Sequence, residues 1–521
     1  MQSLIFAHYK RHREERVIPM GKVESFFRYC FVIFAILVVG IKCMYLFNIL
    51  PTMFAAAGAA GILLLCILAF LFWQRLYDGI ANRMKGIERL SYGKMLIIIA
   101  AISLITKLLA IAVFHVESLN DGSDIDVYVG AAYELGTTGI ATSHAGYLTS
   151  FSHMFWFGAF LSPIAGAFGI SQTAFSIYLT IVLTISSLLL FAAFAEQVGK
   201  NKAFVVFVIF NILPGTILLP QYITHEIALL FFESIAIWIY FRCLPKCKNS
   251  VGRIILYLLF VMALLVASLM NTAGLVMCIA FAILFFVQFL KKFGARTFGL
   301  FAAKILVLIF VIIIGSTIAA GVQRNHCDVP EDYILSDKVL WTMYVGGSVA
   351  HDGEWNSDDS KEFNSYDNDL SYDEIQQFRK DKVIERYREL FNNPSDLGHL
   401  IKQKLITVWG VFGYSILYTN ENIPDPHLQE IYNSLLDRPL LLLEYVATLL
   451  ASIICLVEVI RHRKKASDYA LLIQLYLMGT TAMLMLTECR NKYAIAIQPF
   501  FWMACFVLSR KKESEVVKIE S

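Results

Sequence analysis

The segment Asp121-Gly122-Ser123-Asp124-Ile125-Asp126 places three carboxylates within six positions. Acidic groups this close together can converge on one proton or one cation, and the Gly and Ser between them leave the backbone free to bend. A carboxylate held near a low-dielectric boundary can acquire the raised proton affinity that suits a general base. Asp124, Asp126 and Asp121 are therefore candidate catalytic residues. The alternative is a solvated acidic turn, and the segment alone does not decide between the two.

A second polar group is Thr224-His225-Glu226, which lies between two apolar stretches. His225 and Glu226 can ligate a divalent ion or contact a substrate. The structural alternative is a helix start, with Thr224 as the N-cap and Glu226 in the first turn, where the helix dipole favours a negative charge. Both interpretations stay open at this point.

A third group is Glu488-Cys489-Arg490-Asn491-Lys492-Tyr493. Arg490 and Lys492 can bind a lipid phosphate, Arg through its planar fork and Lys as a point charge. The alternative is that both side chains snorkel toward anionic headgroups. Glu488 joins His225 and Glu226 as a candidate contact for the acceptor or a metal ion. Lys107, in the apolar stretch before the acidic segment, is a further candidate for a phosphate contact.

The elements that must position these residues are membrane helices. The 521 residues are 58% hydrophobic and 16% charged, whereas soluble domains average about 25% charged. Apolar stretches of roughly 20 residues recur along the chain, so we expect an all-α, polytopic transmembrane bundle. About twelve spans are predicted, near residues 29–50, 53–73, 95–114, 173–195, 203–219, 226–241, 254–270, 273–289, 305–320, 439–460, 469–487 and 493–508.

The Lys and Arg residues of the short loops set the orientation. The basic loops near 74–94, 242–253 and 461–465 fall on one side only if the stretches 151–169 and 401–418 do not cross, so both are predicted to be re-entrant or interfacial. Both termini are then cytoplasmic, and no cleaved signal is expected. The loop 115–172, which has acidic residues but no Lys or Arg, is placed outside with the segment 321–438. Lys42 is expected to snorkel to the interface.

Three parts follow from this layout. Residues 1–320 form an N-terminal transmembrane domain with the acidic first outer loop, 115–172. Residues 321–438 form an extracytoplasmic segment with too few apolar residues for a large core of its own, so it should pack on the membrane domain as a cap. Within it, Asp381–Phe391 is predicted to be a short helix that ends at Asn392-Asn393-Pro394. Residues 439–521 form the last transmembrane helices and a cytoplasmic tail. The charge bias of the loops favours a bacterial plasma membrane, and an endoplasmic-reticulum protein would follow the same rule.

These pieces, in this order, resemble the GT-C superfamily of membrane glycosyltransferases, which includes the protein O-mannosyltransferases and the lipid A aminoarabinose transferases. The similarity rests first on Asp124-x-x-x-Tyr128-x-x-x-Ala132-x-x-Leu135-Gly136 after a span. It continues with the run from His153 through Phe168-Gly169-Ile170-Ser171, then Leu213-Pro214 and Thr224-His225-Glu226. Its last part is Glu488-x-Arg490-x-Lys492-Tyr493, which looks like the family's Glu-x-Arg-x-Arg-Tyr. Family members often begin with the span that precedes the acidic loop, whereas here two further spans come before it, and Lys492 stands where Arg is commoner.

The resemblance implies a polyprenyl-phosphate-linked sugar donor, an extracytoplasmic site, and an acceptor that is a glycan, a glycolipid or a protein. Asp124 would be the base, with Asp126 or Asp121 as alternatives, and Arg490 and Lys492 would hold the donor phosphate. A divalent cation is possible but not required, and no nucleic-acid partner is expected. No P-loop pattern is present, consistent with a lipid-linked donor that is already activated. This assignment requires Asp124, Arg490 and Lys492 to border one shared cavity on the non-cytoplasmic leaflet.

Two other functions are compatible with the same composition. A polymerase or ligase of cell-surface glycans that uses lipid-linked oligosaccharides would share the apolar architecture, but it would depend on outer Arg and His rather than on Asp124. A transporter or flippase would place polar residues at the membrane midplane, in broken helices at symmetric positions. The polar groups here cluster toward one interface instead.

Overall fold

The computed structural model describes residues 21–72, 75, 79, 85–117, 119, 124–329, 337–366, 370–410, 412–461 and 467–505. These residues fold into helices, with an isolated parallel bridge between Ala141 and Cys327. The prediction of an all-α protein is confirmed.

Within the described residues, ten helices are long and apolar enough to cross a membrane. The prediction of a polytopic helical membrane protein is therefore confirmed. The ten are α2 (Gly21–Ile49), α3 (Thr52–Leu71), α6 (Tyr92–Phe114), α10 (Gln172–Val198), the run of α13 (His225–Trp238), η2 (Ile239–Cys243) and α14 (Leu244–Lys246), α15 (Ser250–Met270), α16 (Ala273–Lys291), α17 (Ala295–His326), the run of α23 (Pro426–Ile431), η3 (Tyr432–Leu436) and α24 (Asp437–Arg461), and α25 (Asp468–Leu486).

The number of spans differs from the predicted twelve. The count rises from ten to eleven if α11 (Lys200–Ile212) and the following α12 (Pro214–Leu218) with η1 (Leu219–Gln221) form one span bent by 64°. The predicted span 493–508 is not continuous in the described residues, which end at 505. It is divided into the 3₁₀ turn η4 (Asn491–Ala494) and the short helix α26 (Gln498–Ala504). Pro499 lies in the first turn of α26, where a ring without an N–H favours a helix start over a continuing helix.

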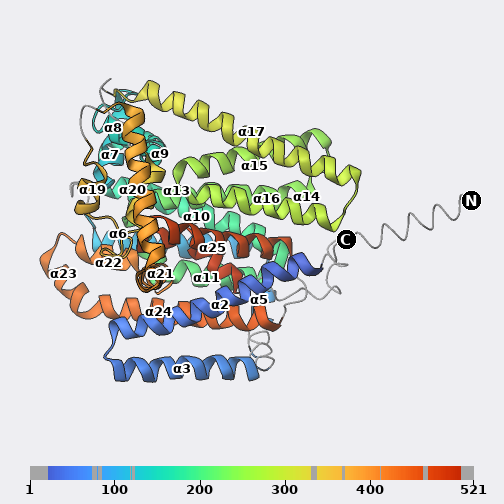
Figure 1. Ribbon diagram of the computed structural model, residues 1–521. Helices are drawn as coiled ribbons and strands as arrows, with labels where there is room; N and C mark the ends of the chain where they lie inside the picture. Colours follow the sequence, from blue (N-terminus) through green and yellow to red (C-terminus); the bar gives the residue numbers. More distant parts are fainter. Residues whose placement is uncertain are drawn as a thin grey trace, which may run out of the picture.

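The two stretches that were expected not to cross are α9 (Ser152–Phe168) and the pair α21 (Pro394–Trp409) and α22 (Tyr414–Glu421). Neither is among the candidate spans of the described chain, and that the two stretches do not cross the membrane stays a prediction. Figure 1 shows α7 (Asp124–Thr137), α8 (Ala145–Ser150), α19 (Ser357–Phe363), α22 and α23 at one end of the bundle. The helices α5 (Lys85–Glu88) and α14, from two basic loops, lie at the opposite end.

Small residues bring α7 close to α9. A Cβ atom on Gly136 of α7 would come within 2.4 Å of the carbonyl oxygen of Ser162, and one on Gly166 of α9 within 2.7 Å of the Gly136 carbonyl oxygen. Small side chains allow such close approach of two helices in a membrane protein. The close α7–α9 contact fixes the axis of α7, and therefore the position of Asp124 at its first turn.

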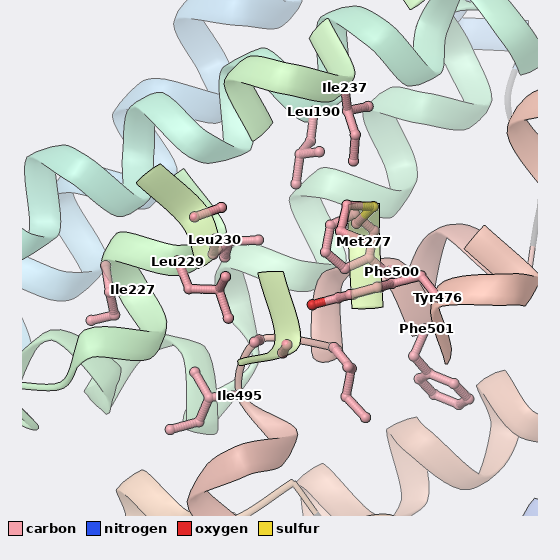
Figure 2. Close-up of a cluster of buried hydrophobic side chains, with 14 of the residues drawn as sticks. Leu190, Ile227, Leu229, Leu230, Ile237, Met277, Tyr476, Ile495, Phe500 and Phe501 are labelled. Atoms are coloured by element: carbon pink, nitrogen blue, oxygen red, sulfur yellow. The ribbon is translucent and has the colours of Figure 1, made fainter. Parts of the chain in front are cut away.

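A large apolar core joins the helices beneath this end. Figure 2 shows part of it, with Leu190 from α10, Leu229 and Leu230 from α13, Met277 from α16 and Tyr476 from α25 gathered around a common centre. Their close packing connects segments that are far apart in the sequence and gives the site a rigid support.

Lys42 departs from the prediction that it snorkels to the interface. Its side chain is fully buried, and Nζ donates hydrogen bonds to the carbonyl oxygens of Trp409 and Gly410 at 3.0 and 2.9 Å and to Thr448 Oγ1 at 3.0 Å. Carbonyl groups at the end of a helix such as α21 lack partners within the helix. Lys42 donates the hydrogen bonds that these carbonyl groups lack, so its ammonium group stays inside the bundle.

The cap is formed by α18 (Lys338–Gly346), α19, α20 (Tyr372–Asn392) and α21. Arg386 holds it together: Nη1 donates to Asp359 Oδ1 at 2.7 Å, and the guanidinium lies 3.5 Å from the centroid of the Tyr344 ring. The predicted helix 381–391 does end before Pro394. It begins earlier than expected, because Ser371 and Glu374 form a capping box at the start of α20.

Candidate active site

A cavity of about 1810 Å³ lies where α7 begins. Its walls come from α7, α8, α9, α13, α16, α18, α19, α20, α22, α25 and the segment after α25. The lining includes six of the residues that the sequence singled out: Asp124, His225, Glu226, Glu488, Arg490 and Lys492. Asp124, Arg490 and Lys492 therefore border one cavity, although Asp124 is more than 360 positions from the other two in the sequence. That this cavity lies on the non-cytoplasmic leaflet stays a prediction.

Asp124 is the first residue of α7 and has two polar partners. Lys492 Nζ lies 3.4 Å from Asp124 Oδ2, and the Tyr147 hydroxyl donates a hydrogen bond to Oδ1 at 3.0 Å. Asp124 remains partly exposed to the cavity, whereas Lys492 is nearly buried. The carboxylate can therefore meet a ligand in the cavity while both partners hold its orientation.

The charges of these groups shift their pKa values. Burial alone would raise the pKa of Asp124, but the Lys492 ammonium and the Tyr147 hydrogen bond outweigh it and hold the pKa below its ordinary value. Burial would lower the pKa of Lys492, but the Asp124 and Glu226 carboxylates raise it. Asp124 and Lys492 are therefore a charged pair at neutral pH.

Glu488 and Arg490 form a second pair on the cavity. Arg490 Nε lies 3.1 Å from Glu488 Oε1. Burial raises the pKa of Glu488, against the opposing effect of Arg490 and Lys492. The backbone here is held by the cap, because Glu488 N donates to Thr342 O at 2.7 Å and Cys489 N donates to Gly353 O at 2.9 Å. These hydrogen bonds fix the backbone next to Arg490, so its guanidinium is held where it can contact an anion in the cavity.

A third cluster contains His225 and Glu226 at the start of α13. The Thr224 hydroxyl donates to Glu226 Oε2, and His225 Nδ1 lies 3.5 Å from the same oxygen. The rings of His153 and His225 meet edge to face, with centroids 4.8 Å apart. Lys338 Nζ donates to His153 Nδ1 at 3.0 Å. Thr224 precedes the helix, as the capping alternative predicts, but its hydroxyl bonds Glu226 rather than the backbone.

Lys338 is a cation that the sequence analysis missed. It lines the same cavity as Arg490 and Lys492. Burial lowers the pKa of Lys338 to about 8, although Glu226 and Glu488 oppose the shift. Burial and the Lys338 charge also hold the pKa of His153 well below its usual value, so His153 is neutral and can accept the Lys338 hydrogen bond. The capping carboxylate of Asp337 was the available sequence signal for a helix starting here.

The remaining candidates lie elsewhere. Asp121 is outside the described residues. Asp126, although in the first turn of α7, is not among the described residues that line the cavity. Lys107 is fully buried in α6, where Nζ donates to Ser103 Oγ and Asn211 Oδ1, both at 3.0 Å. Lys107 does not line the cavity either, so its predicted phosphate contact has no support from this arrangement.

The described residues contain no group of three or more His, Cys, Asp or Glu side chains that could hold a metal ion. His225, Glu226 and Glu488 therefore form no such group in the described chain.

No family model matches this chain, and no curated protein does. Among solved structures, the crystal structure of ArnT from Cupriavidus metallidurans bound to undecaprenyl phosphate is similar at 11% sequence identity and a TM-score of 0.35, over 79% of this chain and 76% of that chain. At that TM-score the similarity supports no conclusion about a common fold or function. The function must be inferred from the side chains of the cavity.

Proposed function

We propose that this protein is a membrane glycosyltransferase that transfers a sugar from a polyprenyl-phosphate donor to an acceptor hydroxyl. The observation that carries the proposal is the pairing of Asp124 with Lys492 at 3.4 Å on a cavity that Arg490 also lines. One cavity thereby offers a carboxylate for an acceptor proton and cations for a donor phosphate. The GT-C resemblance of the sequence agrees with this assignment.

The membrane side of the cavity suits a lipid-linked donor. Leu275 and Ile279 on α16 and Leu486 on α25 line it, and their side chains are among the exposed large apolar residues of the protein. Both helices are candidate membrane spans, so apolar side chains exposed on them face lipid at little cost. A polyprenyl tail can lie along this wall while its phosphate reaches Arg490 and Lys492.

The chemistry then needs no further activation of the sugar. The acceptor oxygen bonds to the anomeric carbon as its proton passes to Asp124, and the bond from the anomeric carbon to the phosphate oxygen breaks. The released polyprenyl phosphate carries the negative charge, which Arg490 and Lys492 stabilise. Holding donor and acceptor together in one cavity supplies a large part of the rate acceleration.

The pairing of Lys492 with Asp124 couples donor binding to the base. An ionised Asp124 with a low pKa is a weak base while Lys492 stays beside it. A phosphate that engages Lys492 draws the ammonium away from Asp124, so the proton affinity of Asp124 rises when the donor is bound. His225 and Glu226, on another wall of the same cavity, are then placed to contact the acceptor.

The proposal also gives each of the three parts of the chain a role in the reaction. Residues 1–320 carry the base and 439–521 the phosphate-binding pair, while the cap within 321–438 closes the cavity on the side away from the basic loops. The cavity faces the non-cytoplasmic side, with both termini in the cytoplasm. The acceptor is a glycan, a glycolipid or a protein.

The test uses the purified full-length protein in lipid nanodiscs with a panel of polyprenyl-phosphate sugars. Asp124→Asn should abolish transfer while donor binding and thermal unfolding stay unchanged. Asp126→Asn, two positions away and not on the cavity lining, is the matched control. Arg490→Ala should weaken donor binding more than acceptor binding.

Three outcomes would contradict the proposal. Full turnover by Asp124→Asn would exclude Asp124 as the base and favour a polymerase or ligase. Uptake of a substrate without a new glycosidic bond would indicate a transporter. A change in acceptor affinity alone, on replacing Arg490, would remove the phosphate assignment.

A further inference from the structure

Trp355 has an unusual position for a large aromatic side chain. It lines the cavity, yet 49% of its surface is exposed. Its ring centroid lies 5.9 Å from the guanidinium carbon of Arg490. By contrast Trp341, also in the cap, is packed against Phe363 and is buried. Trp355 is therefore not needed to fill the cap core, and its exposed ring faces space that a ligand can occupy.

The backbone fixes Trp355 relative to the phosphate-binding segment. Gly353, two residues before it, has φ of +76°, a conformation that favours glycine, and its carbonyl oxygen accepts the hydrogen bond from Cys489 N. A Cβ on Gly353 would lie 2.2 Å from the side chain of Lys404. Lys404 Nζ in turn donates to Thr487 O at 2.7 Å. The loop that presents Trp355 is thus tied to residues on both sides of Glu488.

We propose that Trp355 is the stacking platform for the sugar of the donor. This rests on the proposed function, because in such a donor the anomeric carbon is bonded directly to a phosphate oxygen. If Arg490 binds the phosphate, the sugar ring must lie beside the guanidinium, and Trp355 is the exposed aromatic ring found there. The C–H face of a pyranose is apolar and weakly positive, so it complements the negative face of an indole ring.

The surroundings of Trp355 also suit a sugar. Ser360 and Asn364, from α19 and the residue that follows it, line the same cavity and can exchange hydrogen bonds with hydroxyl groups. Asn356, next to Trp355, caps α19 through a 2.8 Å hydrogen bond from Asp359 N to its side chain. The ring platform and these polar groups therefore belong to one short, capped unit, which would select the sugar independently of the lipid.

The experiment compares two ligands that differ only in the sugar: polyprenyl phosphate and the polyprenyl-phosphate sugar that the wild-type protein turns over. Affinities are measured for wild type, Trp355→Ala and Trp355→Phe in nanodiscs. Trp355→Ala should weaken binding of the sugar-bearing lipid by about 3- to 10-fold, the scale of one aromatic contact, and leave polyprenyl phosphate unchanged. Trp355→Phe should retain most of the affinity. Tyr372→Ala, which removes an exposed cap aromatic at the start of α20, is the matched control.

Each other result overturns the inference. Equal losses for both lipids would show that Trp355 anchors the protein at the membrane interface or supports the phosphate site. Unchanged affinity for both would place the sugar elsewhere, while the proposed function would stand. If wild type binds neither lipid, the proposed function itself fails. Since Trp355 is exposed, Trp355→Ala should unfold at the wild-type temperature. If Trp355→Ala unfolds at a lower temperature, the binding affinities of Trp355→Phe and the wild type are compared instead.

Discussion

Replacing Lys492 by Met should move the acid limb of the transfer reaction toward neutral pH. In the wild type, the Lys492 ammonium outweighs the effect of burial and holds the pKa of Asp124 below its ordinary value. The base must be ionised to accept a proton, so wild-type activity should be limited by Asp124 only in strong acid. Without the ammonium, burial raises the pKa of Asp124, and protonation removes the base at higher pH.

The size of the shift follows from the geometry. Two unit charges 3.4 Å apart attract by about 1 kcal/mol at the dielectric constant of water and by about 5 kcal/mol at an effective value of 20. Asp124 keeps 38% of its side-chain surface exposed, so solvent screening favours the lower end. At about 1.4 kcal/mol per pKa unit, losing an attraction at that lower end should raise the pKa of Asp124 far enough for a pH series to resolve.

The assay measures kcat/KM between pH 4.5 and 8 with a polyprenyl-phosphate sugar, a phosphodiester whose charge is constant over that range. Lys492→Arg keeps the charge and should retain the wild-type profile, while Lys492→Met should also bind the donor about 10- to 100-fold more weakly, as expected for a lost charged hydrogen bond. Weaker donor binding with an unshifted profile would mean that Lys492 does not control Asp124. An unchanged affinity would refute the phosphate assignment.

Three further predictions address other parts of the molecule. Donor affinity should fall as pH rises through about 8, where Lys338 loses its charge, and Lys338→Arg should keep the affinity to higher pH. A wild-type affinity that does not change with pH would show that Lys338 does not contribute to donor binding. Gly136→Ala should lower the unfolding temperature, because its Cβ would lie 2.4 Å from the α9 backbone. Gly130→Ala on the same helix, whose Cβ would have nothing within 4 Å, should be neutral or slightly stabilising. Equal unfolding temperatures for the two variants would contradict the close packing of α7 on α9. Lys42→Met should cost about 2–4 kcal/mol in unfolding free energy by leaving buried carbonyl groups unpaired, and a loss near zero would favour the snorkelling position.

The sequence predicted most of the membrane helices and six of the residues that line the cavity. Apolar length defines a membrane helix directly, because the bilayer leaves few other ways to satisfy the backbone. The distribution of Lys and Arg separated the acidic loop from the basic loops, and Figure 1 shows α7 and α14 at opposite ends. Asp124 and Lys492 were both selected because a charged residue beside an apolar span is costly to keep there without a use.

The partners of the buried lysines could not be predicted. Lys42 and Lys107 have similar apolar neighbours in the sequence, and nothing in that pattern shows that α21 ends beside Lys42 or that Asn211 lies beside Lys107. The cap posed the same problem. Lys338 and Trp355 lie in a polar segment with no membrane pattern. Their positions depend on tertiary contacts, which for Lys338 is a hydrogen bond to His153 and for the loop before Trp355 is the hydrogen bond from Cys489 N to Gly353 O.

The carboxylate partners of the two cations offset the cost of burying positive charge at the cavity. A buried cation without a partner is costly, and Lys492 and Arg490 are both largely removed from solvent. Asp124 and Glu488 meet that cost, because each carboxylate pairs with one of the two cations. An incoming phosphate must then displace carboxylates rather than fill a vacant positive site, and the carboxylate that it displaces from Lys492 is the proposed base. A base that gains proton affinity only when the donor arrives is protected from abstracting a proton before there is a sugar to transfer.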